Sequence, residues 1–254
     1  MRILVTNDDG LQAEGLNRLA EALGTVAETF VVAPAGERSG AGHSITLSKP
    51  VRAEEVRPGW VAVDGTPVDC VILAANELMP QKPDILISGI NHGPNMGEDI
   101  FYSGTVAAAI EGSLTGIPSL AVSIAGKSHL HFEAACAFIV DLVDFIGQSG
   151  LAPGALLNIN VPNLPRESVS GCSLTRLGQR SYTDIITKKQ DPRGRTYYWI
   201  AGQGPNWTGD EQTDFNAVSR GLISITPIHL DLTDHHEMDG LRQQTLSKNF
   251  PLIT

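Results

Sequence analysis

Two adjacent aspartates near the start of the chain carry the groups best suited to chemistry. Asp8 and Asp9 follow the short apolar run at residues 3–5 and precede Gly10, which breaks a strand. Such a run predicts a buried strand of a parallel sheet, and open parallel sheets bind ligands just beyond the carboxyl ends of their strands. The alternative interpretation is that the two aspartates cap the following helix, and this stretch alone does not separate the two.

Two further oxygen-bearing side chains follow other predicted strands. Ser39 lies in a glycine- and serine-rich loop after residues 29–33, and Asn91 lies in a glycine and asparagine loop after residues 84–88. Oxygen donors without cysteine or a clear histidine set favour Mg²⁺ or Mn²⁺ over zinc. The competing interpretation is turn formation, a frequent role of Asp and Asn. The candidate metal ligands are Asp8, Asp9, Ser39 and Asn91.

A helix start offers a second kind of site. Ser103, Gly104 and Thr105 open a segment whose apolar residues recur at helical spacing until Gly116. The unpaired backbone N–H groups and the dipole at such a start favour an anion such as phosphate. An ordinary serine cap explains the same residues without any ligand.

Two histidines occupy positions from which they could assist proton transfer. His43 lies in the same loop as Ser39, and His229 follows a later predicted strand. Imidazole titrates near neutral pH and is the most common general acid or base. The alternative for each is a purely structural role.

Several other nucleophile and nucleotide motifs are absent. The segment Gly126-Lys127-Ser128 has Ala121 where a phosphate-binding P-loop requires glycine, and no strand leads into a G-x-G-x-x-G sequence. There is also no G-x-S-x-G nucleophile elbow. A metal-activated water is therefore the simplest nucleophile that the sequence offers.

The elements that must position these residues alternate between strand and helix as far as about residue 161. Strands are predicted at 3–5, 29–33, 84–88, 119–124 and 156–161, with helices at 16–23, 67–75, 103–114 and 132–146. This order predicts an α/β fold with a mostly parallel sheet. After residue 161, a turn at 191–194 between segments 181–189 and 196–201 predicts a protruding hairpin. A strand at 222–226, interrupted by Pro227, and a weakly helical tail from Glu237 follow.

Composition excludes some classes of partner. The chain has 254 residues, 42% of them hydrophobic and 18% charged, and a net charge of −10. This balance predicts a globular protein and argues against a binder of duplex nucleic acid. No run reaches the roughly 18 apolar residues of a membrane span and no secretory signal opens the chain, so we expect a cytoplasmic protein without membrane contact. The three cysteines, Cys70, Cys136 and Cys172, lack metal or redox spacing and are interpreted as reduced thiols.

Four segments together resemble the SurE family: ILVTNDDG, ERSGAGHSIT, SGINHGPNMGEDIFYSGTVAAAIEG and SITPIHLDLT. The resemblance runs from Met1 to about Thr233. It implies a single domain over residues 1–254, with a Rossmann-like three-layer core at 1–161. Residues 162–254 would then supply the hairpin, a returning strand and a C-terminal segment used in homodimer or homotetramer assembly.

The resemblance also implies an activity. SurE proteins are phosphatases of nucleoside 5′- and often 3′-monophosphates that use one divalent cation per subunit, Mg²⁺, Mn²⁺ or Co²⁺, and some also trim short polyphosphate. The implied metal ligands are Asp8, Asp9, Ser39 and Asn91, and the implied phosphate-binding residues are Asn95, Ser103, Gly104 and Thr105. We add His43 as a further candidate substrate contact, from its place in the loop that carries Ser39. One departure from the family pattern is His92 in place of a small residue, which is expected to alter substrate access.

The predicted mechanism is attack of a metal-bound water on the phosphate of a nucleoside monophosphate. Asp8 or Asp9 would orient or deprotonate that water, and His229 would protonate the leaving alkoxide. Two alternatives stay open at this point. One is exopolyphosphatase as the main activity, and the other is a non-catalytic sensor that binds nucleotides through the same metal.

Overall fold

A computed structural model describes residues 1–181, 186–200 and 206–244 of the chain. Its main feature is a nine-stranded sheet with the order β3-β4-β2-β1-β5-β6-β7-β13-β8. The strands are β1 (Arg2–Thr6), β2 (Glu28–Pro34), β3 (Ala53–Arg57), β4 (Trp60–Val63), β5 (Ile85–His92), β6 (Ser119–Ala125), β7 (Leu156–Pro162), β8 (Cys172–Leu174) and β13 (Ile223–Ile228). The helices are α1 (Glu14–Leu23), α2 (Pro67–Leu73), α3 (Gly104–Leu114), α4 (Phe132–Ser149), α5 (Asp214–Ser219) and α6 (His235–Gln244), with short helical turns η1 (Ala74–Leu78), η2 (Gly97–Phe101) and η3 (Arg166–Ser168).

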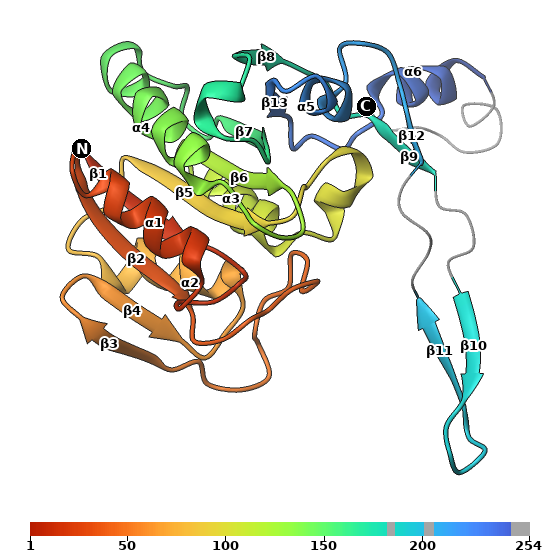
Figure 1. The fold of residues 1–254 in the computed structure, drawn as a ribbon, viewed down its shortest axis with the longest axis horizontal. Helices are drawn as coiled ribbons and strands as arrows, with labels where there is room; N and C mark the ends of the chain where they lie inside the picture. The colour runs from red at the N-terminus through yellow and green to blue at the C-terminus, as the bar shows by residue number, and fades with distance from the viewer. Residues whose placement is uncertain (182–185, 201–205, 245–254) are drawn as a thin grey trace.

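The core lies in three layers, as the sequence predicts (Figure 1). Helices α1 and α4 pack on one face of the sheet, and α2 and α3 pack on the other. In β1, Ile3 and Val5 point to the α1 and α4 side while Leu4 points to the other, and all three are fully buried. Burial of each such side chain stabilises the fold by about 1.5–3 kcal/mol relative to an exposed one. This burial on both faces fixes β1 as a central strand.

The order of the strands creates a crevice beside β1. The chain passes from β1 to its parallel neighbour β2, and later returns to place β5 parallel to β1 on the opposite side. The strand order therefore reverses between β1 and β5. In open α/β sheets, this reversal leaves a crevice at the carboxyl ends of the two strands, where ligands bind.

Four of the strands differ from the expectation. The edge strand β3 and its neighbour β4 are not predicted, because every residue of β3 is exposed and gives no apolar alternation. Strand β5 does not end at residue 88 but runs on to His92. The extension passes through Gly89, where φ is +142° and a Cβ would lie 2.3 Å from the Val122 carbonyl oxygen, so the position requires glycine. Strand β13 continues through Pro227, where the neighbouring β8 no longer pairs and a missing N–H is tolerated.

The later part of the chain adds two arms to the body, of which one is a hairpin and the other carries α6 (Figure 1). Strands β10 (Ile186–Gln190) and β11 (Thr196–Ile200) form the predicted antiparallel hairpin, and its turn is held by Asp191, whose side chain accepts from the backbone of Arg193 and Arg195. Two further short strands, β9 (Gln179–Ser181) and β12 (Asn206–Thr208), pair at its base. The predicted hairpin residues at 182–185 and 201, and the tail beyond residue 244, lie outside the described residues.

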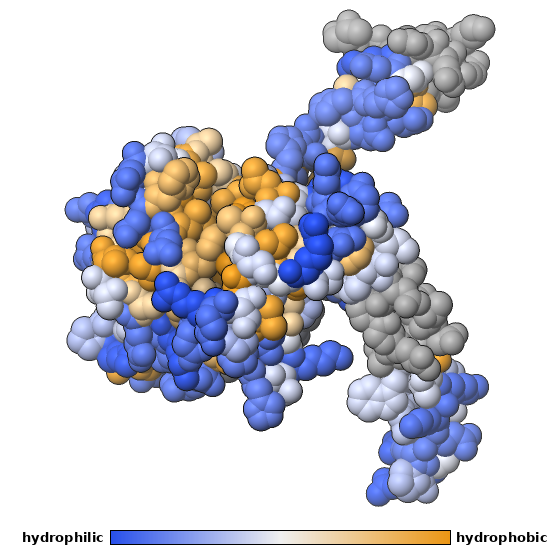
Figure 2. Space-filling model, turned by 45° about the horizontal axis from the view of Figure 1, so that its top comes forward, coloured by the Kyte–Doolittle hydropathy of each residue, from blue (hydrophilic) through white to orange (hydrophobic). Residues whose placement is uncertain are grey.

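The surface of the two arms differs from that of the body. Figure 2 shows mainly hydrophilic residues on the hairpin and on the arm that carries α6, whereas apolar residues gather on the visible face of the body. None of the helices in the described part of the chain is both long and apolar enough to cross a membrane. Strands β13 and β8, which follow residue 161, extend the same sheet as the strands before it. The expected division of the chain at residue 161 stays a prediction.

Gly15 of α1 provides a test of how closely the helix packs on the sheet. A Cβ at Gly15 would lie 2.2 Å from the Ile90 carbonyl oxygen, whereas a Cβ at Gly147 of α4 meets nothing within 4 Å. We expect Gly15→Ala to lower the free energy of unfolding by roughly 2 kcal/mol through overpacking. Gly147→Ala should raise it by about 0.5–1 kcal/mol through helix propensity. Urea unfolding of both variants measures this, and equal effects would contradict the close approach.

Candidate active site

A polar pocket of about 480 Å³ opens at the carboxyl ends of β1 and β5. It contains most of the residues that the sequence singled out, from segments far apart in the chain. Its lining residues are Asp8, Asp9, Ser39, Gly40, Asn91, His92, Gly93, Pro94, Asn95, Asp99, Tyr102, Ser103 and Arg180. The two aspartates, Ser39 and Asn91 are thus brought together, as parallel strands with a shared edge predict.

A tight turn after β1 presents the two aspartates. The Asn7 side chain donates to the Gly10 carbonyl oxygen at 3.0 Å and accepts from the Gly10 N–H at 3.2 Å. Gly10 has a φ of +96°, and a Cβ there would lie 2.9 Å from the backbone of Gly36. The Asp8 carbonyl oxygen in turn accepts from the Arg38 N–H at 2.7 Å. These contacts dock the loop that bears Ser39 onto the turn.

The start of α3 makes a close contact with Asp8. A Cβ at Gly104 would lie 2.7 Å from the Cβ of Asp8, so only glycine permits this approach. The Thr105 hydroxyl, fully buried, donates to Asp8 Oδ1 at 2.5 Å. Ser103 caps the helix by accepting from the Val106 N–H at 3.1 Å. Hence Ser103 lines the pocket at the helix start, while Gly104 and the hydroxyl of Thr105 lie against Asp8.

Burial shapes the electrostatics of both carboxyl groups. Asp8 is only 4% exposed, and this desolvation raises its pKa, with a further increase from the neighbouring charge of Asp9. Desolvation also raises the pKa of Asp9, against the opposing influence of His92, whose backbone N–H donates to Asp9 Oδ2 at 3.2 Å. Two adjacent and partly desolvated carboxylates repel each other, and a bound cation would relieve that repulsion.

The donor set fits a hard divalent cation. The Asn91 side-chain nitrogen donates to the Gly93 carbonyl oxygen at 2.7 Å. This hydrogen bond leaves Oδ1 of Asn91 as the atom that can serve as a ligand. Ser39 is exposed, and its hydroxyl donates to Glu37 at 2.8 Å. Within the described residues, no group of three or more His, Cys, Asp or Glu side chains is arranged to hold a metal. Two carboxylates with neutral oxygen donors suit Mg²⁺ or Mn²⁺ better than zinc.

Asn95 is fixed at the floor of the pocket by β7. Its backbone N–H donates to Asn160 Oδ1 at 2.9 Å, and its carbonyl oxygen accepts from the side chains of Asn158 and Asn160. The Asn95 side chain donates to Ser123 of β6 at 2.8 Å. A buried network of this kind holds the amide group in one orientation. Sequence reasoning did not find Asn158 and Asn160, because a polar residue in a buried strand carries no local signal of its partner.

The structure does not bring the two candidate histidines into this pocket. His43 and His229 instead line a separate, mainly apolar cavity of about 600 Å³ that lies against α3 and β13. His43 pairs with Glu111 of α3 at 3.0 Å. The ring of His229 accepts from the Asp231 N–H at 3.3 Å. His92 lines the polar pocket, and its ring packs against Phe132 at 5.4 Å between centroids.

Two charged residues of the pocket escaped sequence reasoning. Arg180 of β9 and Asp99 of η2 form an ion pair that lines it. The backbone N–H of Arg180 also donates to the Glu98 carboxylate at 2.7 Å. The partners are about 80 positions apart in the chain, and no motif links them.

Comparison with known proteins gives consistent matches. Residues 3–184 match the family model described as survival protein SurE. A protein of Geobacter metallireducens named 5′-nucleotidase SurE is 51% identical over 244 residues, covering 95% of this chain and 96% of that protein. One of Geobacter sulfurreducens with the same name is 50% identical, covering 97% and 95%. The crystal structure of SurE protein from Aquifex aeolicus superposes with a TM-score of 0.86 at 43% identity, covering 95% of this chain and 98% of that one.

The contact between Thr105 and Asp8 yields a test of the cation site. We expect Thr105→Val to weaken Mn²⁺ binding roughly 10- to 100-fold, because partners that orient a metal ligand typically contribute this much affinity. Thr105→Ser keeps the hydroxyl and should stay near the wild type. Calorimetric titration with Mn²⁺ measures both variants. Unchanged affinity in Thr105→Val would remove the orienting role of this hydrogen bond.

Proposed function

The chain belongs to the SurE family, and from this membership we propose that it is a 5′-nucleotidase that releases phosphate from nucleoside 5′-monophosphates. One observation carries the proposal. The paired carboxylates of Asp8 and Asp9 share a pocket with the N-terminus of α3, in a chain about half identical to proteins named 5′-nucleotidases. A hydrolase is thereby favoured over the non-catalytic sensor.

Asp8, Asp9, Ser39 and Asn91 would hold one divalent cation, for which Mg²⁺, Mn²⁺ and Co²⁺ are the candidates. When bound, such an ion supplies Lewis-acid activation of the phosphoryl group and a water of lowered pKa. The fit of the site supports this assignment: its donors are oxygens, and the two carboxylates are desolvated side by side.

The protein groups around the pocket divide the remaining work. The first backbone N–H groups of α3 have no acceptor within the helix and would donate to phosphate oxygens, beside Asn95. Asp9, the more exposed of the two carboxylates, would orient the attacking water and accept its proton. Burial raises the pKa of Asp9 and so makes its carboxylate a stronger base, which is the direction that the latter role needs.

Protonation of the leaving alkoxide needs a separate group. His229 is our proposed donor, and His43 our proposed contact to the rest of the substrate. Both line the apolar cavity next to α3, so each imidazole would have to turn from that cavity to reach the phosphate.

Finer features of the activity follow from the family membership alone. We propose that 3′-monophosphates are also hydrolysed, with short polyphosphate as a secondary substrate. We also propose assembly into homodimers or homotetramers, which light scattering of the purified protein would measure. A monomer at micromolar concentration would remove the proposed assembly without affecting the nucleotidase.

A phosphate-release panel tests the activity. We expect release from 5′-monophosphates that disappears in EDTA and returns with Mn²⁺ or Mg²⁺, because two buried carboxylates repel a phosphate without an intervening cation. The panel should include 3′-monophosphates and tripolyphosphate. Faster release from tripolyphosphate than from any nucleotide would favour an exopolyphosphatase, and no release with any metal would restore the sensor.

The role of His229 is tested by changing the leaving group. We expect His229→Ala to lower kcat for a 5′-monophosphate about 100-fold, because an alkoxide needs a proton as it departs. The same variant should hydrolyse p-nitrophenyl phosphate almost as fast as the wild type, since that leaving group is stable without a proton. Equal losses for both substrates, or none, would assign the proton to another group.

A further inference from the structure

Arg180 is the one lysine or arginine among the described residues that line the Asp8–Asp9 pocket. Its side chain is 20% exposed and is paired with Asp99, which is 18% exposed. The guanidinium also lies 5.5 Å from the ring centroid of Trp207. Trp207 stacks in turn on Phe215, with centroids 5.5 Å apart and the ring planes 16° from parallel. The guanidinium is thus held against an aromatic pair at the pocket wall.

The charges of the pocket give this cation a function. Asp8, Asp9 and Asp99 are acidic, so a divalent cation at the two adjacent carboxylates leaves Asp99 to be offset by Arg180. A phosphate that enters brings additional negative charge. A guanidinium presents five N–H donors in one plane, and can therefore serve a carboxylate and a phosphate oxygen at the same time.

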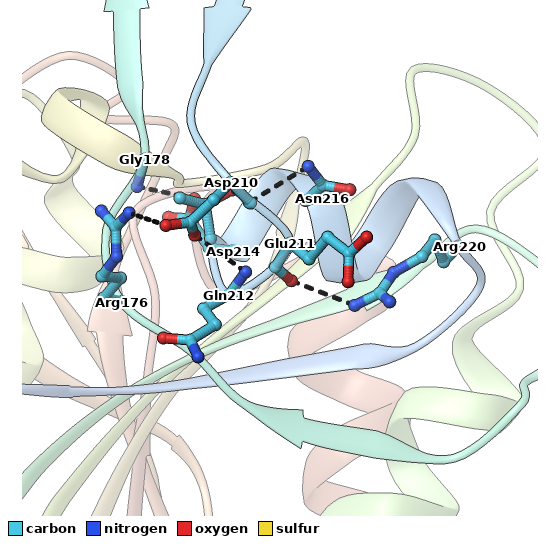
Figure 3. A network of polar contacts seen from close by, with 9 residues as sticks. Arg176, Gly178, Asp210, Glu211, Gln212, Asp214, Asn216 and Arg220 are labelled. Carbon is cyan, nitrogen blue, oxygen red and sulfur yellow. Dashed lines mark hydrogen bonds and ion pairs between the residues drawn. The ribbon is translucent and has the colours of Figure 1, made fainter.

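A buried carboxylate sets the position of this wall. Asp214, fully buried, accepts from the Gly97 N–H at 2.8 Å and from the Gly178 N–H at 3.0 Å. Figure 3 shows Asp214 directed at Gly178, two residues before Arg180. Gly97 and Gly178 are in backbone contact, since a Cβ at Gly97 would lie 2.7 Å from the Gly178 carbonyl oxygen. Asp214 therefore joins the segment of Asp99 to the segment of Arg180.

We propose that Arg180 contacts the phosphate group of the substrate and sets the affinity of the pocket for it. This inference rests on the proposed nucleotidase function, because it identifies the cation that the phosphate meets opposite Asp8 and Asp9. The competing role is structural: the ion pair with Asp99 only fastens η2 to β9. The two roles differ in the effect that they predict for loss of Asp99: a structural role requires both partners for phosphate binding, whereas a phosphate contact requires Arg180 alone.

The experiment measures binding of inorganic phosphate to the Mn²⁺-loaded protein by calorimetry, which requires no turnover. We expect Arg180→Gln to weaken phosphate binding at least 10-fold, and Arg180→Lys to restore part of it, because lysine keeps the charge without the planar set of donors. Asp99→Asn should bind phosphate as well as the wild type or more tightly, since it removes a competing negative charge and leaves the guanidinium in place.

Arg176→Gln is the matched control. Arg176 lies four positions earlier in the same segment and is also paired with an aspartate, Asp210, at 2.7 Å (Figure 3). It lines the other cavity and not the Asp8–Asp9 pocket. Its variant should bind phosphate like the wild type. Mn²⁺ affinity and the thermal midpoint, measured on every variant, report any loss of the fold.

Two outcomes overturn the inference. Equal weakening in Arg180→Gln and Asp99→Asn would assign the pair a structural role, and unchanged binding in Arg180→Gln would remove Arg180 from the phosphate site. Failure of the nucleotidase proposal is distinguishable from both. If the wild type binds phosphate through Arg180 but hydrolyses no nucleotide, the inference stands and the nucleotidase proposal fails. If the wild type is active but Arg180→Gln binds phosphate equally well, the nucleotidase proposal stands and the inference fails.

Discussion

The contact between Asp8 and the first turn of α3 constrains the rest of the pocket. Gly104 lacks the Cβ that would collide with Asp8, and Thr105 donates its hydroxyl to the same carboxyl group. The helix can then lie close enough to exclude water from Asp8 while Ser103, the residue that caps its N-terminus, lines the pocket. The same approach produces the desolvation that raises the pKa of Asp8. One contact therefore brings a helix N-terminus, which carries a partial positive charge, next to a desolvated carboxylate, which favours a cation.

The sheet supplies the second constraint by placing the ends of β1 and β5 next to each other. The two strands pair in parallel from Ile3 with Ile85 to Thr6 with Ser88. Beyond Ser88, the irregular step at Gly89 carries β5 on to Asn91, beside the aspartates that follow β1. Asn95 is then anchored on the next two strands. Candidate ligands from distant positions in the chain thus meet because backbone pairing sets their spacing.

Sequence patterns predict the features that depend on local order. The alternation of apolar strands and helices gives the α/β layers, and the strand ends give the shared location of Asp8, Ser39 and Asn91, because both follow from periodicity and from the geometry of parallel sheets. The positions of His43 and His229 depend on how loops fold over α3, which no periodicity encodes. Arg180 is similarly hidden, since its place is set by Asp214 and Trp207, which are distant in the chain. The edge strand β3 is missed because exposed strands need no apolar pattern.

The link between Asp214 and Gly97 also orders events during synthesis. The two residues are 117 positions apart, whereas β1, β5, β6, β7 and α3 all precede Asp214 in the chain. At typical translation rates of about 5–20 residues per second, Asp214 emerges on the order of ten seconds after Gly97. The nascent chain thus contains Asp8, Asp9 and Asp99 before it contains Asp214, the residue that fixes the segment of Arg180. The acidic side chains of the pocket are therefore synthesised first, and the residue that positions the opposing arginine follows them.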